Sequence, residues 1–466
     1  MLRIFDTKTR EIVELKPADG KTIKMYTCGP TVYNFPHIGN LRTYAFEDFL
    51  RRVIRFFGMN VYQVMNLTDI DDKTIRGALA KKVALSEFTN IYRDAFFEDL
   101  QTLKIEKAEK YPAATDHIPD MIQMIQTLIQ KGIAYRTEDG NVFFRISKFP
   151  HYGALSHLNL SELKEGASQR VSNDEYEKES VSDFALWKAY EPEKDGDIFW
   201  DSPWGKGRPG WHIECSAMAI RYLGETLDLH MGGVDNMFPH HENEIAQSEG
   251  CTGKTFSRYW MHTEHLLVDG KKMSKSLGNF FTLRDLLNKG YSGREVRYML
   301  LCTHYRTQLN FTFEGLESAR QSLKRIDDFI ARLTCFKEEV LGDVLAEISE
   351  VRESFKQSIG EDLNISAGLA VLFDFIRKMN SYSDSGKIGK RQSDQILGLL
   401  KEWDAVLGFL YQEEKVIPLE IEEMAKKRLL ARQEKDWKQS DLIRSEIDAA
   451  GYIIEDIPSG YLLKKK

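Results

Sequence analysis

The first clear pattern along the chain is a strand, an amphipathic helix and a second strand. Residues 23–28 form a short run that ends at Gly29, and residues 61–67 form a similar run. The segment between them carries apolar residues that recur every four positions: Leu41, Ala45, Phe49, Val53 and Phe57. This period predicts one apolar face of a helix, and Gly58 marks its end. The three elements predict a right-handed βαβ unit in a parallel sheet.

The pattern changes from about residue 116 and later returns to strands. A helix is expected over residues 121–129, and the polar, charged residues 160–182 predict a loop or arm. Residues 226–230 and 259–262 are again typical of strands. The sheet is therefore expected to resume after an insertion of roughly 80 residues.

The remainder of the chain is predominantly helical. From Glu295 the helical pattern runs through residues 351–379 and 393–410, with a polar gap at residues 381–386. A basic helix and a hairpin-like tail follow Pro418. We predict an α/β protein: a Rossmann-like, doubly wound parallel sheet with an inserted connective domain, then a helical bundle and a small C-terminal domain.

Length and composition fit several domains and exclude some classes of protein. A chain of 466 residues is too long for one ordinary core, and as a soft prior it suggests roughly three domains. The net charge of −7 argues against a generally basic surface, so any nucleic-acid contact must come from local patches. The sequence lacks the apolar run of about 20 residues that a membrane span needs. The charged N-terminus argues against a secretory signal, and five cysteines, an odd number, suit reduced thiols in the cytoplasm.

Four residues have the chemistry of zinc ligands: Cys28, Cys215, His240 and Glu244. His240 and Glu244 are four residues apart in a helical stretch, so they lie on one face. Two thiolates, an imidazole and a carboxylate make a plausible tetrahedral site. The alternative is that the cysteines are small buried residues and the histidine lies at the surface.

Two further segments suit phosphate binding. Residues 36–40 connect the first strand to its helix, where backbone amides and the small Gly39 would admit a triphosphate. Residues 268–276 predict a hairpin turn at Asp269-Gly270 and then a basic loop, in which Lys272 and Lys275 could stabilise charge on phosphate oxygens. The alternatives are an ordinary turn with an asparagine cap and a solvated loop.

Taken in order, these motifs resemble those of a known family. His37-Ile-Gly-Asn40 with Lys272-Met-Ser-Lys-Ser276 resembles the two signatures of class I aminoacyl-tRNA synthetases, with Asn40 in place of the usual second histidine. Three more stretches are similar to the cysteine-specific members of that family. They are residues 26–33, 207–216 and 238–248, and the resemblance covers nearly the whole chain.

The resemblance implies that the enzyme activates cysteine with ATP and attaches it to tRNA(Cys). It implies one zinc ion per chain, bound by Cys28, Cys215, His240 and Glu244, which binds the substrate thiolate. The residues that it places around the cysteine substrate are Thr68, Trp211 and His230. From its position alone, Thr68 could instead cap a helix.

The resemblance also assigns the nucleotide and tRNA sites. It implies that ATP, bound with Mg²⁺, is contacted by His37, Gly39, Asn40, Asp235, Lys272 and Lys275, of which His37, Asn40, Lys272 and Lys275 are the catalytic candidates. The basic C-terminal segment is expected to read the anticodon, with Arg432, Trp437, Asp441 and Asp456 as base-reading candidates. The alternative is a solvated helix with Trp437 in its core.

With this resemblance, the chain divides into five segments. We expect residues 1–115 and 201–293 to form the two halves of the catalytic domain, with the zinc site and the basic loop in the second half. Residues 116–200 are expected to be the inserted connective domain. Residues 294–417 are the expected stem-contact and helical bundle domain, and residues 418–466 are the expected anticodon-binding domain.

Three other functions remain as alternatives. A related ligase that joins cysteine to an amino sugar through the same adenylate would lack the segment after Pro418. A zinc hydrolase would leave an open water position on the metal, and the chain contains no HExxH motif. A non-catalytic RNA-binding protein would not need both phosphate signatures. We expect a cytoplasmic monomer without a membrane partner.

Overall fold

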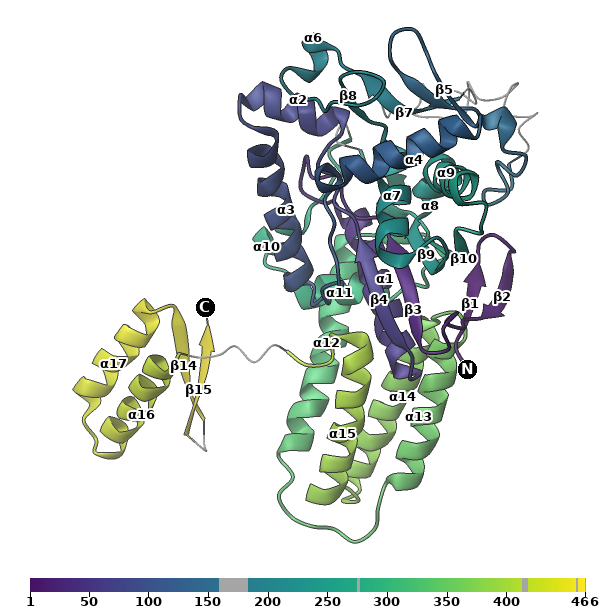
Figure 1. Ribbon diagram of the computed structural model, residues 1–466. Coiled ribbons are helices and arrows are strands. Elements are labelled where there is room, and N and C mark those ends of the chain that lie inside the picture. Colours follow the sequence, from purple (N-terminus) through teal and green to yellow (C-terminus); the bar gives the residue numbers. More distant parts are fainter. Residues whose placement is uncertain (159–182, 275–276, 413–417, 458–459, 466) are drawn as a thin grey trace. The chain divides into compact units, whose positions relative to one another are not determined.

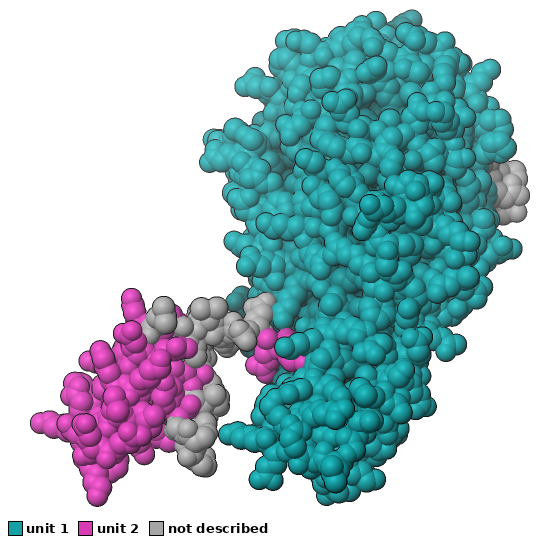
Figure 2. All heavy atoms as spheres, turned by 60° about the horizontal axis from the view of Figure 1, so that its bottom comes forward, with its two compact units in different colours: residues 1–410 teal, residues 411–466 magenta. Residues whose placement is uncertain are grey.

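The computed structural model describes most of the chain as two compact units. The described residues are 1–158, 183–274, 277–412, 418–457 and 460–465. The units are Met1–Leu410 and Tyr411–Lys466, which have different colours in Figure 2. The expected loop or arm at residues 160–182 lies outside the described residues. Among the described helices, none has the length and apolar character needed to cross a membrane.

Four parallel strands form the central sheet of the first unit (Figure 1). Their spatial order is β10 (Ser257–Thr263), β9 (Leu227–Gly233), β3 (Thr22–Thr27) and β4 (Asn60–Met65). Tyr26 of β3 pairs with Val64 on one side and with His230 on the other. The predicted fold class is confirmed, because these strands form a Rossmann-like parallel sheet interrupted by an inserted antiparallel sheet.

Helices α1 (Ile38–Phe56) and α7 (Trp211–Leu223) cover opposite faces of this sheet. The chain crosses from β3 to β4 in one direction and from β4 to β9 in the other, so right-handed crossovers place the two helices on opposite sides. The predicted face of α1 is buried, and Gly58, with φ +83°, follows its end. Because α1 begins where β3 ends, its N-terminus lies at the carboxyl edge of the sheet, where α/β proteins bind ligands.

The insertion between β4 and α7 consists of helices followed by a small antiparallel sheet with the order β5-β6-β7-β8. Its helical elements are α2 (Asp72–Lys81), α3 (Leu85–Thr102), η1 (Ala114–His117), α4 (Ile118–Gln130), η2 (Ile146–Lys148) and α6 (Pro192–Asp195). Its strands are β5 (Ala134–Arg136), β6 (Val142–Phe144), β7 (Phe184–Ala189) and β8 (Gly207–Pro209). The insertion shares a continuous apolar core with the sheet domain, since Phe184 of β7 and Cys215 of α7 belong to one buried cluster.

Helices dominate the second half of the first unit. A small sheet comes first, with β11 (Leu266–Val268), β12 (Lys271–Lys272) and β13 (Leu309–Phe311). The helices are α10 (Leu283–Asn288), α11 (Gly293–Leu301), α12 (Phe313–Thr334), α13 (Leu345–Gly360), α14 (Ile365–Asp384) and α15 (Lys390–Leu407). The N-terminal hairpin β1 (Arg3–Asp6) and β2 (Glu11–Glu14) pairs antiparallel.

Two boundaries in the bundle differ from the prediction. The pattern over residues 351–379 is split between α13 and α14, because Asp362 and Leu363 both adopt φ +55°. The predicted polar gap at residues 381–386 was largely wrong, since α14 continues to Asp384. Its last turn is held by polar contacts to neighbouring helices, including a 2.9 Å hydrogen bond from Tyr382 Oη to a Glu347 carboxylate oxygen.

Asp362 joins the N-terminal hairpin to the helical bundle. Asp362 is 4% exposed, and its carboxylate accepts hydrogen bonds from Phe5 N at 2.8 Å and Tyr305 Oη at 2.5 Å. Arg306 Nε donates to the second carboxylate oxygen at 2.7 Å. Two segments that are distant in the sequence, β1 and residues 305–306, therefore depend on one buried carboxylate.

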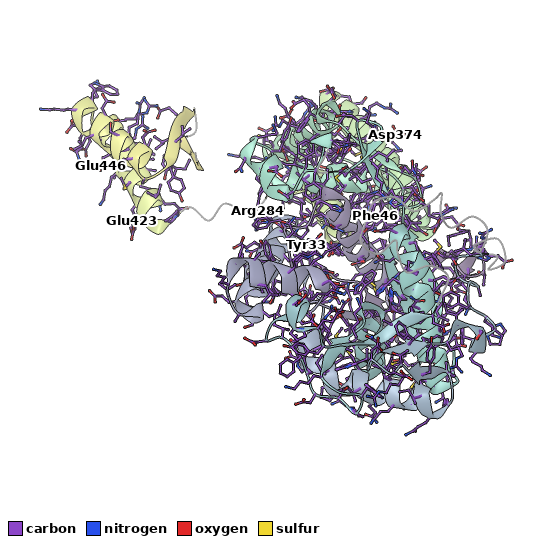
Figure 3. All side chains as sticks on the ribbon, turned by 90° about the horizontal axis from the view of Figure 1, so that it is seen from above. Tyr33, Phe46, Arg284, Asp374, Glu423 and Glu446 are labelled. Carbon is purple, nitrogen blue, oxygen red and sulfur yellow. The ribbon has the colours of Figure 1, made fainter. Side chains whose placement is uncertain are left out.

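The variant Asp362→Ala is expected to lower the free energy of unfolding of the first unit by about 2–4 kcal/mol, because it leaves buried donors without their acceptor. Urea unfolding followed by circular dichroism measures this loss. The control is Asp374→Ala, whose carboxylate pairs with Arg377 on the exposed surface of α14 (Figure 3). We expect that control to change stability by less than about 0.5 kcal/mol. Equal losses in the two variants would contradict this role for Asp362.

The second unit has its own small core. It contains α16 (Leu419–Gln433), α17 (Trp437–Ala449), β14 (Tyr452–Ile457) and β15 (Gly460–Lys465), the last two paired antiparallel. The core residues come from both helices and from β14: Ile421, Ala425, Ile443, Ile447, Tyr452 and Ile454. The hairpin-like tail predicted from the sequence corresponds to the β14–β15 hairpin.

Candidate functional site

The structure brings the four predicted metal ligands together at the carboxyl edge of the sheet. Cys28 directly follows β3, and Cys215 lies in the second turn of α7. His240 lies in a segment that begins with α8 (Val234–Asn236). That segment continues through the π-helical turn η4 (Met237–His241) into α9 (Glu242–Thr252), which carries Glu244. All four side chains are buried, and their ligand atoms lie within 4.8 Å of one another. This arrangement is compatible with a metal ion.

The charges of the cluster also fit a cation. Burial acts to raise the pKa of Cys215, but hydrogen bonding with Cys28 and the nearby His240 lower it to about 6. Burial acts to lower the pKa of His240, but Glu244 and Cys215 raise it to about 10. Burial acts to raise the pKa of Glu244, but His230 and His240 lower it to about 2. The site thus favours a thiolate and a carboxylate around one positive charge.

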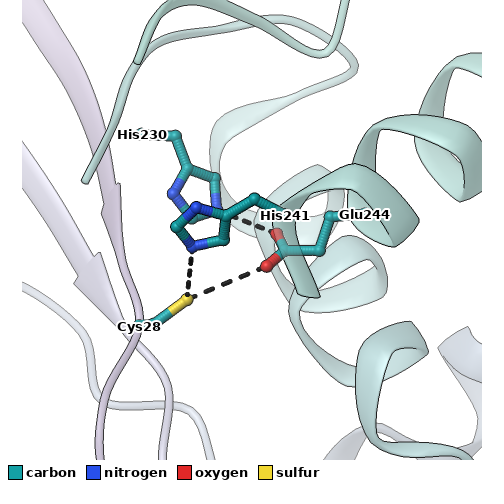
Figure 4. A group of neighbouring side chains, drawn as sticks. All are labelled: Cys28, His230, His241 and Glu244. Atoms are coloured by element: carbon teal, nitrogen blue, oxygen red, sulfur yellow. Dashed lines mark hydrogen bonds and ion pairs between the residues drawn. The ribbon is translucent and has the colours of Figure 1, made fainter. Parts of the chain in front are cut away.

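A second group shares two residues with the first. Cys28, His230, His241 and Glu244 also have ligand atoms within 4.8 Å of one another, and Figure 4 shows them. The imidazole Nε2 of His241 lies 3.3 Å from Cys28 Sγ, and Nε2 of His230 lies 2.8 Å from Glu244 Oε2. The two groups overlap, so Cys28 and Glu244 are contacted from both sides.

His241 continues into a chain of hydrogen bonds that sequence reasoning missed. Its Nδ1 lies 2.8 Å from Nε2 of His262, whose Nδ1 lies 2.9 Å from the Thr7 hydroxyl. Burial lowers the pKa of both histidines, that of His262 to about 3, so both rings are neutral. This chain holds the His241 ring with its Nε2 against the sulfur of Cys28, and partners of this kind commonly orient metal ligands. The only sequence signal was the presence of further histidines near the motifs.

Glu242 and Asn243, which lie between His240 and Glu244, also form hydrogen bonds. The Glu242 carboxylate accepts hydrogen bonds from Gly153 N at 3.0 Å and from Ser156 N at 2.7 Å. The side chain of Asn243 accepts a hydrogen bond from the Tyr152 hydroxyl. Helix α9 is therefore hydrogen-bonded to the loop that follows η2 in the insertion.

The three predicted cysteine-pocket residues surround this cluster. Trp211 stacks on His240, with ring centroids 4.1 Å apart and planes 16° apart. His230 stacks on Trp260 at 4.6 Å. Thr68 is buried, and its hydroxyl donates to Glu214 Oε2 at 2.8 Å. The pocket candidates therefore share one region with the metal cluster.

Thr68 does not cap a helix, contrary to the alternative considered from its position. Asp71 is the N-cap of α2, because its carboxylate accepts from Lys73 N while Thr74 reaches back to the Asp71 amide. The partner of Thr68 is Glu214, which precedes a metal candidate and which the sequence analysis overlooked. Nothing in the helical periodicity distinguishes Glu214 from an ordinary surface carboxylate.

The start of α1 forms a reciprocal cap. His37 is the N-cap, so the alternative of an asparagine cap is wrong, and Asn40 completes the cap from the third helical position. His37 Nδ1 accepts from Asn40 N at 3.1 Å, and Asn40 Oδ1 accepts from His37 N at 3.3 Å. Ile38 N and Leu41 N are bonded to Phe281 O and His37 O, so the amides of the first turn are largely engaged within the protein.

The predicted hairpin turn and basic loop lie beside this helix start. Asp269 and Gly270 form the turn between β11 and β12, with φ +50° and +72°. Lys272 is exposed at the end of β12, whereas Lys275 lies outside the described residues. A Cβ atom on Gly39 would approach Met273 Cε to 2.9 Å, so glycine lets the methionine side chain pack closely on the helix start.

The ribose candidate Asp235 follows the end of β9. It lies on the short helix α8, and a Cβ atom on Gly233 would come within 2.4 Å of Asp235 Oδ1. Gly233 therefore permits the carboxylate to fold back over the strand end. This edge also carries Cys28, at the end of the neighbouring strand β3.

The four anticodon candidates all lie in the second unit. Arg432 packs over Trp437 at 5.5 Å and pairs with Asp456 at 3.4 Å. Trp437 is 56% exposed, so it is not a core residue of this unit, contrary to the alternative interpretation. Asp441 is exposed one helical turn after Trp437. Asp456 also accepts two hydrogen bonds from the buried Arg428, which fixes its orientation.

Comparison with known protein families gives two matches. Residues 14–321 match the family described as tRNA synthetases class I (C) catalytic domain, and residues 354–412 match the DALR domain family. The cysteine–tRNA ligase of Protochlamydia amoebophila (strain UWE25) is 56% identical, over 100% of this chain and 98% of the relative. The cysteine–tRNA ligase of Chlamydia muridarum (strain MoPn / Nigg) is 54% identical, over 100% and 99%.

Solved structures support the same fold. A Mycobacterium tuberculosis methionyl-tRNA synthetase in complex with methionyl-adenylate matches with a TM-score of 0.59 and 14% identity, over 84% of this chain and 88% of that one. The LeuRS of Agrobacterium radiobacter K84 matches with a TM-score of 0.60 and 11% identity, over 84% of each chain. Because the catalytic-domain family covers residues 14–321 and the curated relatives cover the whole chain, the chain belongs to the cysteine–tRNA ligase family of class I aminoacyl-tRNA synthetases.

Proposed function

We propose that this cysteine–tRNA ligase selects its amino acid at a zinc site made by Cys28, Cys215, His240 and Glu244. Its substrates are L-cysteine, ATP with Mg²⁺ and tRNA(Cys). The observation that carries the proposal is the convergence of these four buried donors within 4.8 Å. All four come from one chain, so each monomer carries a complete site.

The donor set fits zinc in particular. Two cysteine sulfurs favour a soft or borderline metal over magnesium or calcium. The positive charge on His240 lies between Glu244 and Cys215, and a divalent cation would take its place, with His240 binding as a neutral imidazole. A bound zinc ion supplies a Lewis-acid position for a soft sulfur ligand. Trp211 and His230 bound the space beside it and exclude larger side chains.

This arrangement explains how serine is rejected without a second hydrolytic site. Serine differs from cysteine only by oxygen in place of sulfur, and a small change in an apolar pocket is worth only about 1–3 kcal/mol. A thiol loses its proton at modest pH and becomes a good metal ligand, whereas a hydroxyl stays protonated. The discrimination therefore rests on ligand chemistry rather than on shape.

The phosphates of ATP are placed at the start of α1. Because His37 Nδ1 accepts from Asn40 N, the proton of a neutral His37 ring sits on Nε2, which can donate to a phosphate oxygen. Asn40 Oδ1 is engaged by His37 N, so its Nδ2 group supplies the donor. In this proposal, Lys272 and Lys275 of the second signature supply positive charge to the phosphates, and Asp235 accepts hydrogen bonds from the ribose hydroxyls. The cysteine carboxylate then attacks the α-phosphate and pyrophosphate departs.

The second unit is proposed to read the anticodon. Trp437 offers an exposed ring for stacking on an unpaired base, and Arg432 lies over that ring. Asp441 and Asp456 provide acceptors for base edges. The tRNA 3′ end receives the activated cysteine at the first unit, so the two units perform separable tasks.

The test of the proposed function is ATP–pyrophosphate exchange measured with each amino acid, together with metal analysis. We expect cysteine alone to support rapid exchange and one zinc ion per chain to co-purify. Exchange with serine that equals exchange with cysteine, or full activity in a zinc-free protein, would contradict the proposal.

The variant Lys275→Ala is expected to slow adenylate formation by about 100-fold while cysteine binding changes less than about 3-fold, because charge on the phosphates develops in the transition state. Pre-steady-state adenylate formation and equilibrium cysteine binding measure the two effects. Lys289→Ala, outside the signature loop, is the control and should leave both unchanged. Equal losses in rate and cysteine affinity would contradict this role.

A further inference from the structure

The segment that follows the basic loop returns over the start of α1. Phe281 O accepts a hydrogen bond from Ile38 N at 2.9 Å, which is an amide of the first turn of α1. Thr282 pairs with His37 in an isolated antiparallel bridge. The backbone of Phe281 and Thr282 therefore pairs with that of Ile38 and His37 in the first phosphate signature.

Side chains reinforce this attachment. The ring of Phe280 meets the His37 imidazole edge-on, with centroids 5.4 Å apart and planes at 84°. On the other limb of the loop, Met273 packs over Gly39. Both limbs of the loop therefore touch the same helix start, and the direction of the His37 ring depends on where the returning limb lies.

Arg284 fixes the returning limb in place. It lies in the first turn of α10, which Thr282 caps, and its guanidinium carbon is 4.6 Å from the ring centre of Phe35. Its Nη1 donates to Asp99 Oδ1 at 2.6 Å, and its Nη2 donates to Glu98 Oε2 at 2.8 Å. One guanidinium thus joins α10, α3 and the loop that leads to His37 (Figure 3 labels Arg284 and Tyr33 of that loop).

Further contacts hold the Arg284 guanidinium and the Phe35 ring against α3. Asp99 is a buried carboxylate, with a side chain 3% exposed, while the Arg284 side chain is 28% exposed. Arg284 Nη2 also donates a hydrogen bond to Ala95 O at 3.2 Å, so the guanidinium binds both the backbone and the side chains of α3. Tyr92 of α3 meets the Phe35 ring edge-on at 5.4 Å, which closes the other side of that ring.

We propose that Arg284 is a positioning residue for adenylate formation, which holds the backbone of residues 280–282 against the first signature and so keeps the His37 ring directed at the triphosphate. This inference rests on the proposed function. Arg284 acts through Phe35 and the 280–282 backbone rather than by touching ATP. A small misplacement of reacting groups can cost on the order of 100-fold in rate, so a remote anchor of this kind affects the chemical step.

The variant Arg284→Gln tests the proposal, with Arg320→Gln as a matched control. Arg320 also packs over an aromatic ring, that of Tyr291 at 4.5 Å, and it pairs with Glu295 and Glu317 with a side chain 36% exposed. We expect Arg284→Gln to lower kcat for cysteine-dependent ATP–pyrophosphate exchange by about 10- to 100-fold. Zinc content and KM for cysteine should stay close to those of Arg320→Gln, with both variants assayed well below their unfolding midpoints. The conservative Arg284→Lys should recover part of the rate.

A double-mutant cycle separates positioning from general support. With His37→Ala already present, adding Arg284→Gln should lower kcat by less than about 3-fold, because the group that it positions is gone. The same fold-loss in both backgrounds, or no loss of kcat in Arg284→Gln, would overturn the inference. Wild-type protein that shows no cysteine-dependent exchange would instead contradict the proposed function itself.

Discussion

Replacing Cys215 by serine is expected to remove the bound metal and to lower kcat/KM for cysteine-dependent exchange by at least about 100-fold. Even groups that only support metal ligands are worth about 10- to 100-fold in affinity or activity, and Cys215 is a proposed ligand itself. The serine hydroxyl stays protonated and replaces the thiolate poorly. Metal analysis and exchange assays with cysteine and with serine measure the effect, while ATP binding should change little.

The matched control is Cys335→Ser, which alters an exposed cysteine at the end of α12. This control should retain the metal and the full exchange rate. A Cys215→Ser protein that contains no zinc and still prefers cysteine strongly over serine would overturn the account of specificity. Retention of both zinc and activity would show that Cys215 is not a ligand.

Removing residues 418–466 is expected to leave cysteine activation largely intact and to lower tRNA charging by on the order of 100-fold or more. The removed segment has its own core, so the sheet and the metal cluster keep their packing. A base stacked on Trp437 is worth about 1–3 kcal/mol, and the basic and acidic base-reading candidates are lost with it, which together account for the effect. Exchange and aminoacylation assays on the same preparation separate the two steps.

The point variant Trp437→Ala refines this test, because it removes one exposed ring and keeps the fold of the second unit. We expect it to reduce charging by about 10-fold, in line with the loss of one stacked base, and to leave exchange unchanged. A truncated protein that charges tRNA at the full rate would show that the second unit does not read the anticodon.

The sequence predicted the sheet and its first crossover helix because their signals are local. The fourfold spacing from Leu41 to Val53 is a property of α1 itself, and the face that it marks is buried. The metal cluster is different, since Cys28 and Glu244 are far apart in the chain and meet only in the folded sheet. Ligand chemistry suggested the group, but spacing alone left it ambiguous, and the resemblance decided between a metal site and the alternative.

The predictions that were wrong, and the residues that were overlooked, also have physical explanations. Periodicity does not reveal a break such as the one at Asp362, where positive φ angles interrupt a continuous helical pattern. His37 caps α1 with a ring nitrogen, whereas serine, threonine, aspartate and asparagine are the usual caps. Glu214 and His241 act through partners distant in sequence, so no local pattern could have identified them.

The stretch from His240 to Glu244 limits how this enzyme can be given a new amino-acid specificity. Each of its five side chains contacts a different neighbour, so no position in it is free for a library of substitutions. Exchanging a ligand would also disturb the fastening to the insertion through Glu242 and Asn243. Redesign is therefore expected to succeed first at Trp211 and Thr68, the proposed pocket residues outside this stretch, with residues 240–244 carried over unchanged.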